Sequence, residues 1–201
     1  MLKVGLTGGL ACGKSFVGEA LAGMGCYLIR ADELGHEVEA PGGEAYEPVI
    51  REFGREILAD DGQIDRKRLA SRVFGNPEAL GRLNALVHPA VVRREEELIQ
   101  EFARREPNGI AVVEAAILIE TGSYKRFDRI ILVTCAEEQQ VERALRRDQA
   151  PEAEIRARLS RQMPVADKKH FAHFVIDTSG AKEDTLRQTR AVYEQLRRIQ
   201  I

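Results

Sequence analysis

The sequence contains 201 residues, of which 44% are hydrophobic and 31% are charged, and its formal net charge is −2. This length is sufficient for one compact hydrophobic core. The slightly acidic balance argues against a nucleic-acid partner, because proteins that bind nucleic acid usually carry a basic excess. We recognise no signal-peptide pattern and no run of about 18 apolar residues, so we expect no membrane partner. The three cysteines form no CxxC pair and indicate free thiols in a reducing, cytoplasmic environment.

Five short apolar stretches have the composition of buried β-strands. Their apolar residues are continuous rather than alternating, as expected for strands that are covered on both faces. Patterns typical of helices separate the stretches, and this alternation predicts an α/β fold with a five-stranded parallel sheet and right-handed crossovers. The predicted strands cover residues 2–7, 26–29, 110–114, 129–135 and 174–177.

The first strand is followed by a glycine-rich loop, GGLACGKS at 8–15, which fits the pattern G-x-x-x-x-G-K-[ST]. Such a loop surrounds a phosphate with its backbone N–H groups, which requires residues without an obstructing Cβ. The helix predicted after it, from an apolar stripe over 16–24 that Gly25 ends, would present its positive end to the anion. Lys14 can reach the outer phosphates, and the Ser15 hydroxyl can ligate Mg²⁺. We therefore predict a triphosphate site with contacts from Gly9, Ala11, Cys12, Gly13, Lys14, Ser15 and Phe16.

Acidic residues stand at the ends of the second and third predicted strands, where ligands bind in open α/β sheets. Asp32 could accept a hydroxyl proton or orient that hydroxyl toward the γ-phosphate. It could equally be the N-cap of a helix over 33–40. Glu114 could be the acidic residue on the Mg²⁺ side of the site, or a surface residue, and Glu120 is a weaker candidate.

The long segment over 33–108 has the pattern of several short helices rather than of one crossover. Asn76-Pro77 is typical of an N-cap followed by proline at the first helical position, and His88-Pro89 repeats this arrangement, which predicts a second helix start there. His88 could cap that helix or contact a ligand. We interpret the segment as a helical excursion that carries substrate contacts.

A second, arginine-rich excursion covers about 137–168. Arg143 and Arg147 are four residues apart and would share one face of a helix. Two guanidinium groups on one face could converge on a phosphate, or they could simply be solvated. The spacing of Ile155, Leu159 and Met163 predicts a helix in this excursion. A last helix over about 183–199 is expected to pack on the sheet.

Taken together, these motifs resemble those of the dephospho-coenzyme A kinase family. The resemblance extends over nearly the whole chain, and its most specific part is the stretch LNALVHP at 83–89. The matching residues are Val4–Gly9, Gly13–Ser15, Ala31-Asp32, Leu83–Pro89, Leu118–Glu120, Asp128, Gln140–Asp148, Arg158, Gln162–Pro164, Lys168 and Val175–Asp177.

The resemblance implies ATP- and Mg²⁺-dependent phosphorylation of the ribose 3′-hydroxyl of dephospho-coenzyme A, giving coenzyme A and ADP in the last step of coenzyme A biosynthesis. It implies a single P-loop NTPase domain of three α/β/α layers over 1–201, acting as a monomer or a weak homo-oligomer. The core would comprise about 1–32, 109–136 and 169–201, the coenzyme-binding helical excursion 33–108, and the lid 137–168. The alternatives are a kinase for another small acceptor, such as a nucleoside monophosphate, and a non-enzymatic nucleotide switch.

The resemblance also implies roles for individual residues. The catalytic residues would be Lys14, Asp32 and Arg147, with Asp32 activating the hydroxyl. Arg143 and Arg147 would contact the nucleotide from the lid. The residues that would bind the acceptor substrate are Thr7, Asp32, Leu83, His88, Pro89 and Glu114.

Five positions depart from the usual pattern of the family. Glu114 and Ala116 stand where Asp and Pro are common, Cys12 replaces a small Ser, Phe16 replaces a Thr, and Thr178 replaces an Asn. A thiol at a helix N-terminus can have a lowered pKa. Cys12 is therefore either a redox-sensitive thiol or a small residue that fills space in the loop.

Overall fold

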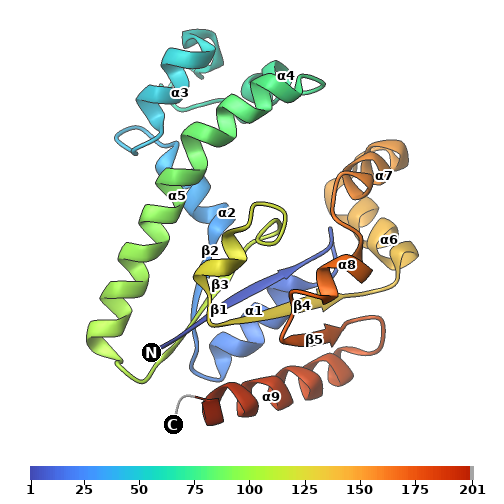
Figure 1. Cartoon of the computed structure of the whole chain (residues 1–201). Coiled ribbons are helices and arrows are strands. Elements are labelled where there is room, and N and C mark those ends of the chain that lie inside the picture. The colour runs from blue at the N-terminus through green and yellow to red at the C-terminus, as the bar shows by residue number, and fades with distance from the viewer. Residues whose placement is uncertain (200–201) are drawn as a thin grey trace. The chain divides into compact units, whose positions relative to one another are not determined.

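The computed structural model describes residues 1–199 and has a three-layer α/β fold (Figure 1). Its five strands lie in the order β2-β3-β1-β4-β5, and the pairs β1–β3, β1–β4 and β4–β5 are parallel. In the register of the sheet, Val4 of β1 lies between Val112 of β3 and Arg129 of β4. The strands are β1 (Leu2–Gly8), β2 (Tyr27–Arg30), β3 (Ile110–Glu114), β4 (Arg129–Thr134) and β5 (Phe174–Asp177).

The chain divides into two compact units. The first consists of Met1–Ile29 and the residues from Glu101 onward, and the second of Arg30–Gln100. The helices of the first unit are α1 (Lys14–Gly23), η2 (Ser123–Arg126), α6 (Glu137–Asp148), α7 (Glu152–Ser160), α8 (Val165–Lys169) and α9 (Lys182–Ile199). The second unit contains α2 (Ala31–Val38), α3 (Tyr46–Phe53), η1 (Arg55–Ile57), α4 (Arg66–Val73) and most of α5 (Pro77–Arg105). The coenzyme-binding role of the segment over 33–108 and the lid role of 137–168 stay predictions.

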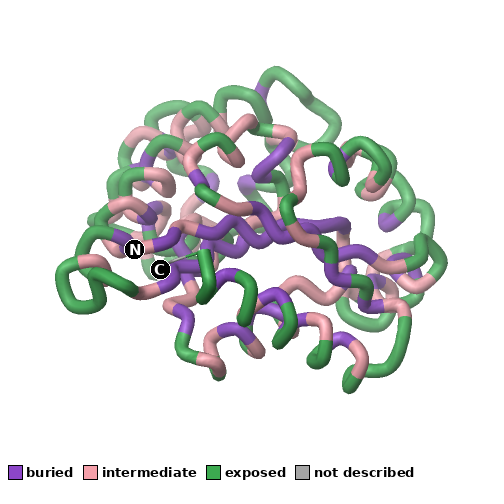
Figure 2. Tube along the Cα trace, turned by 60° about the horizontal axis from the view of Figure 1, so that its bottom comes forward, coloured by how far each residue is buried: buried purple, intermediate pink, exposed green. Residues whose placement is uncertain are grey.

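Helices α1 and α9 cover one face of the sheet in the first unit, and the strands carry about half of its buried residues (Figure 2). Successive side chains of a strand point to opposite faces, so Val4 and Leu6 of β1 face these two helices. Gly5, which lies between them, faces the other way. A Cβ on Gly5 would lie 2.8 Å from Ile130 Cδ1 and 3.0 Å from Leu118 Cδ1. Side chains therefore pack closely on the second face of the sheet at Gly5.

The second unit has a small hydrophobic core of its own. Its helices bury Val38, Val49, Ile57 and Leu69 against one another. Helix α4 begins at a well-formed cap, because the side chain of Asp65 accepts hydrogen bonds from the backbone N–H groups of its first turn. Among the described residues, no helix combines the length and the apolar character that crossing a membrane requires.

Most of the predicted strands are confirmed, and 110–114 and 174–177 match without a shift. The second strand begins one residue later than predicted, because the N–H of Cys26 is used to cap α1 by donating to the Leu21 carbonyl. Asp32 consequently lies neither at the end of the strand nor at a helix N-cap. It occupies the first turn of α2, whose N-cap is Arg30.

One helix prediction in the excursions is wrong, and another is confirmed, as α7 with Ile155 and Leu159, except that the helix ends before Met163. Pro89 does not start a helix, because it lies inside α5, which begins at Pro77 with the Asn76 side chain bonded to the Ala79 N–H. Proline removes a single helical hydrogen bond, and the burial of Ala90 on the same helix favours continuation. Met163 is not part of a helical stripe, since α7 ends at Ser160. The residue that precedes a proline disfavours helical angles, and Met163 precedes Pro164.

The packing of α9 on the sheet can be tested by replacing two leucines of that helix. Leu196 is fully buried in the core, whereas Leu186 is 40% exposed. We expect Leu196→Ala to lower the free energy of unfolding by about 3 kcal/mol, because it removes buried methyl groups and leaves a cavity. The matched control Leu186→Ala should lower it by less than about 1 kcal/mol. Urea denaturation followed by circular dichroism measures both, and equal losses would contradict the placement of Leu196.

Candidate active site

The loop between β1 and α1 has the backbone geometry of an anion-binding loop. Gly13 has φ +87° and is the left-handed N-cap of α1, and Ala11 also has a positive φ, of 52°. A Cβ on Gly8 would lie 2.3 Å from the backbone oxygen of Val133, so only glycine fits where β1 runs against β4. The loop therefore leads directly into the free N–H groups at the start of α1.

Lys14 and Ser15 occupy the positions that the phosphate-loop pattern predicts. The ammonium of Lys14 folds back over the loop and donates to the carbonyls of Gly9, at 3.0 Å, and Gly8, at 3.4 Å. The hydroxyl of Ser15 donates to Glu114 Oε1 at 2.7 Å. Glu114 ends β3 and is buried, so it is not the surface residue that the sequence also allowed.

The hydroxyl–carboxylate pair Ser15–Glu114 offers oxygen atoms of the type that Mg²⁺ prefers. Within residues 1–199, no group of three or more His, Cys, Asp or Glu side chains is arranged to hold a metal ion. A magnesium ion here would therefore take ligands from Ser15, the substrate phosphates and water, which is its usual coordination in phosphate-transferring enzymes. The residues present fit such an ion.

Arg143 is tied to the phosphate loop through Thr178, the residue after β5. Its guanidinium donates to the hydroxyl of Thr178 at 3.0 Å and to the carbonyl of Thr178 at 2.8 Å. The Thr178 hydroxyl lies 2.8 Å from the carbonyl of Cys12 and 3.2 Å from that of Thr134. Thr178 is buried, so these bonds connect α6, β4 and the phosphate loop in a site shielded from water. The sequence alone did not suggest this role.

Cys12 is a buried thiol, and the hypothesis that its pKa is lowered is wrong. Its sulfur lies 3.1 Å from the carbonyl of Val133, in hydrogen-bonding contact. Burial raises the pKa of the Cys12 thiol, and the nearby positive charges of Lys14 and Lys168 oppose this only in part. Desolvation of a thiolate outweighs the attraction of a helix N-terminus at this position. The structure therefore favours the reading of Cys12 as a residue that fills space in the loop.

Arg147 binds Asp148, whereas Arg143 binds Thr178. Arg147 lies on the exposed side of α6, and its guanidinium donates to Asp148 Oδ1 at 2.6 Å. Arg158 of α7 binds the other carboxylate oxygen of Asp148, also at 2.6 Å. These hydrogen bonds, first that of Arg147, lower the pKa of Asp148. Two positive charges of the arginine-rich segment are thus held together by one carboxylate.

The remaining predicted contacts in the first unit are placed as follows. Thr7 is fully buried, and its hydroxyl donates to the carbonyl of Ala116 at 3.3 Å. The ring of Phe16 lies 5.8 Å from the ammonium of Lys182. Gly9 is approached closely by α6, since a Cβ on it would lie 2.4 Å from Gln140 Oε1.

Four predicted site residues belong to the second unit. Asp32 is exposed in the first turn of α2. Leu83 packs against the core of that unit, and Pro89 is exposed on α5. His88 is half-buried, and this burial lowers the pKa of its imidazole. Their contacts with a substrate stay predictions.

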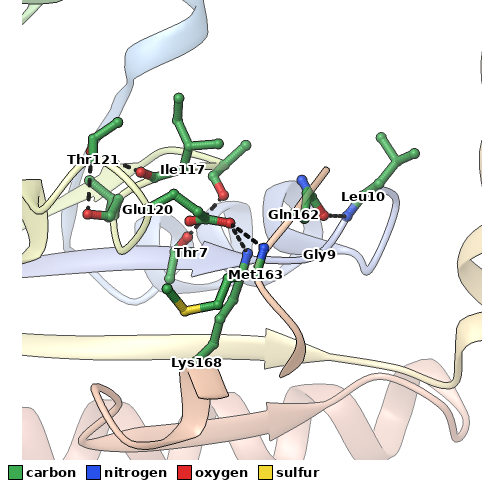
Figure 3. A network of polar contacts seen from close by, with 12 residues as sticks. Thr7, Gly9, Leu10, Ile117, Glu120, Thr121, Gln162, Met163 and Lys168 are labelled. Atoms are coloured by element: carbon green, nitrogen blue, oxygen red, sulfur yellow. Dashed lines mark hydrogen bonds and ion pairs between the residues drawn. The ribbon is translucent and has the colours of Figure 1, made fainter. Parts of the chain in front are cut away.

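One cluster of contacts beside the phosphate loop was not found by reasoning from the sequence (Figure 3). The N–H of Leu10 donates to Gln162 Oε1 at 3.0 Å. Glu120 Oε1 accepts the N–H of Met163 at 3.3 Å and forms an ion pair with Lys168 Nζ at 2.7 Å. The only signal in the sequence was that Glu120, Gln162, Met163 and Lys168 lie in stretches that carry the family resemblance.

Comparison with known proteins identifies the family. A model of the family described as dephospho-CoA kinase matches residues 2–184. The chain is 37% identical over 198 residues to the dephospho-CoA kinase of Aquifex aeolicus, covering 98% of this chain and 99% of that protein. This chain belongs to the dephospho-CoA kinase family. The predicted resemblance and the prediction of an enzyme, a phosphate-transferring transferase, are thereby confirmed.

Solved structures agree with this membership of the dephospho-CoA kinase family. A crystal structure from Thermus thermophilus has a TM-score of 0.81 and 32% sequence identity, with 97% of both chains covered. The dephospho-CoA kinase from Campylobacter jejuni has a TM-score of 0.65 and 25% identity, with 96% of both chains covered. The predicted P-loop kinase fold is therefore confirmed.

The burial of the cysteines predicts their reactivity. Burial raises the pKa of Cys26 to about 12 and raises those of Cys12 and Cys135 as well. Thiol reagents attack the thiolate, so near neutral pH all three should react more slowly than free cysteine and faster as the pH rises. Cys135, which is only half-buried, should react first. Timed labelling with Ellman's reagent, followed by mass spectrometry, measures the order, with urea-unfolded protein as the control. Labelling of Cys12 ahead of Cys135 would contradict the burial argument.

Proposed function

We propose that this chain transfers the γ-phosphate of ATP to the ribose 3′-hydroxyl of dephospho-CoA, giving CoA and ADP in the last step of CoA biosynthesis. The observation that carries the proposal is the family match over residues 2–184. The phosphate loop supports it, because Lys14 binds the loop carbonyl of Gly9 and Ser15 binds Glu114. Each of these groups has a use in phosphoryl transfer.

The phosphate loop binds and orients the donor. The N–H groups at the start of α1 and the ammonium of Lys14 hold the β- and γ-phosphates. In the structure Lys14 is held by the carbonyls of Gly8 and Gly9, so it is already directed across the loop before a nucleotide arrives. Charges that are fixed in place in this way stabilise a transition state without reorganisation.

Ser15 and Glu114 would hold Mg²⁺ on the nucleotide. Ser15 would supply its hydroxyl as a ligand, and Glu114, which lies 2.7 Å from that hydroxyl, would orient a metal-bound water. The ion, when bound, neutralises charge on the β- and γ-phosphates. The longer side chain of Glu114, compared with the Asp that is usual in the family, still reaches Ser15.

Asp32 prepares the acceptor. It orients the ribose 3′-hydroxyl toward the γ-phosphorus and takes the proton as the new oxygen–phosphorus bond forms and the bond to the β-phosphate oxygen breaks. Its exposure on the first turn of α2 leaves the carboxylate accessible to a substrate. In this proposal Leu83, His88 and Pro89 contact the coenzyme, and Thr7 supports the acceptor side of the site.

Arg143 and Arg147 serve the lid, which closes over the transferred phosphate and excludes water. Exclusion of water matters because water would otherwise accept the phosphate and hydrolyse ATP. Arg143 is anchored by Thr178 beside the loop, whereas Arg147 is exposed and could exchange its bond with Asp148 for one with a phosphate.

The proposed reaction would take place in the cytoplasm. The free thiol of Cys135, which is only half-buried, is in keeping with the reducing conditions there.

A panel of acceptors tests the proposed substrate. Dephospho-CoA, a nucleoside monophosphate and shikimate would each be incubated with ATP and Mg²⁺, and the position of the new phosphate would be determined by ³¹P and ¹H NMR. We expect phosphate only on the ribose 3′-oxygen of dephospho-CoA. Transfer to another acceptor, with dephospho-CoA unchanged, would favour the alternative of a kinase for a different small molecule.

Replacement of the two central groups should slow the chemical step. We expect Lys14→Ala and Asp32→Asn each to lower kcat by at least about tenfold, or roughly 1.4 kcal/mol of transition-state stabilisation. The matched control for Asp32→Asn is Glu33→Gln, which removes a charge from the neighbouring, exposed residue. Steady-state kinetics with dephospho-CoA provide the measurement. Wild-type turnover by Asp32→Asn would rule out its role as the base.

The lid role of Arg147 predicts an effect on turnover rather than on binding. Arg147→Ala should lower kcat by about tenfold and change the KM for dephospho-CoA by less than about twofold, because the lost charge acts on the transferred phosphate. Arg146→Ala is the matched control, since Arg146 is 78% exposed and pairs with Glu142 on the same helix. If the two variants have the same kcat, Arg147 has no special part in the reaction.

A further inference from the structure

Leu10 is the place where the arginine-rich segment holds the phosphate loop. Its N–H donates to Gln162 Oε1 at 3.0 Å. Its side chain packs against the small apolar cluster of α6 and α7, which consists of Val141, Ala144 and Ile155. One residue of the loop is therefore held both by its backbone and by its side chain.

The segment that carries Gln162 is itself fixed by a buried charge. We call residues 161–169, which follow α7 and include α8, the return segment. Lys168 is fully buried, and its ammonium forms an ion pair with Glu120 Oε1 at 2.7 Å. The same oxygen accepts the N–H of Met163, the residue next to Gln162 (Figure 3). A buried ammonium is strongly destabilised without a charged partner, so Glu120 holds the return segment in one position.

The phosphate loop needs such support, because part of it is conformationally unfavourable. Ala11, the neighbour of Leu10, has φ +52°, a left-handed conformation that residues with a Cβ rarely adopt. Residues in such conformations persist only where the surroundings hold them. The contacts of Leu10 lie immediately beside this residue, and Ala11 packs on the same apolar cluster.

We propose that Gln162 and the Glu120–Lys168 pair are positioning residues, which hold the phosphate loop in its ATP-binding conformation and make that conformation depend on the placement of the lid. These groups act through the Leu10 N–H rather than on a phosphate. The inference rests on the proposed use of ATP at this loop, but it does not depend on the identity of the acceptor. A loop that is formed before binding loses less conformational freedom when ATP arrives, so the affinity for ATP reports on the contact.

The first experiment compares Gln162→Leu, which removes the acceptor oxygen, with Gln162→Glu, which retains one. We expect amide hydrogen exchange at Leu10, measured by NMR in the nucleotide-free protein, to become about tenfold faster in Gln162→Leu. In Gln162→Glu it should stay near the wild-type rate. The absence of nucleotide in this measurement ensures that the added negative charge of Glu does not interfere. Gln100→Leu, the same replacement at an exposed position, is the control.

The second measurement separates positioning from a general loss of structure. Isothermal titration calorimetry should give a Kd for MgATP that is about tenfold higher in Gln162→Leu, with the Kd for dephospho-CoA changed by less than about twofold. Neither titration requires turnover, so a failure of the proposed phosphate transfer would not be mistaken for a failure of this inference. An unchanged Kd for MgATP, an equal loss for both ligands or an unchanged Leu10 exchange rate would each overturn the proposal.

A double-mutant cycle tests whether the ion pair acts through Gln162. Removal of both charges by Glu120→Gln with Lys168→Met avoids leaving a buried charge unpaired. This variant should also raise the Kd for MgATP, and adding Gln162→Leu to it should raise the Kd by less than about twofold more, because the two changes affect one contact. Additive losses would show that the ion pair only stabilises the fold, and would overturn its part in the proposal.

Discussion

The phosphate-binding loop depends on how closely β1 and β4 approach each other at Gly8. Because there is no room for a Cβ against the Val133 carbonyl, the last residue of β1 must be glycine, and the chain turns after it. The turn then places Gly13, in its left-handed conformation, at the start of α1. An anion-binding site made of backbone N–H groups exists only where a strand, a turn and a helix are aligned in this manner. The parallel sheet is therefore part of the binding site as well as its support.

Around this loop, side chains from distant parts of the chain form a second layer that holds the first. Glu114 from the end of β3 binds Ser15, and Thr178 from the end of β5 connects Arg143 to the carbonyl of Cys12. Both positions lie at the carboxyl ends of strands, where the parallel sheet collects its polar groups. Glu114 and Thr178, which depart from the usual family pattern, each make these contacts in this chain.

The arginine-rich segment contains both exposed and buried ion pairs. Arg147 and Arg158 share Asp148 on the exposed surface, where an ion pair contributes little stability and can exchange partners easily. The Glu120–Lys168 pair is buried, and a buried pair is costly to break. The segment therefore combines a buried ion pair beside the loop with ion pairs on its exposed surface. Such a combination would suit the lid role that we propose for this segment.

The sequence by itself determined the sheet, the phosphate loop and the family, because these depend on local patterns. Continuous apolar runs identify buried strands, and the spacing of Gly8, Gly13, Lys14 and Ser15 follows from the geometry of one turn. Only the tertiary structure decided what depends on packing between distant segments. It continued α5 through Pro89 and buried Cys12, which raised the pKa of a thiol whose reactivity the sequence had left open. It also joined Gln162 to Leu10 across 152 positions of sequence, a contact that no local pattern can encode.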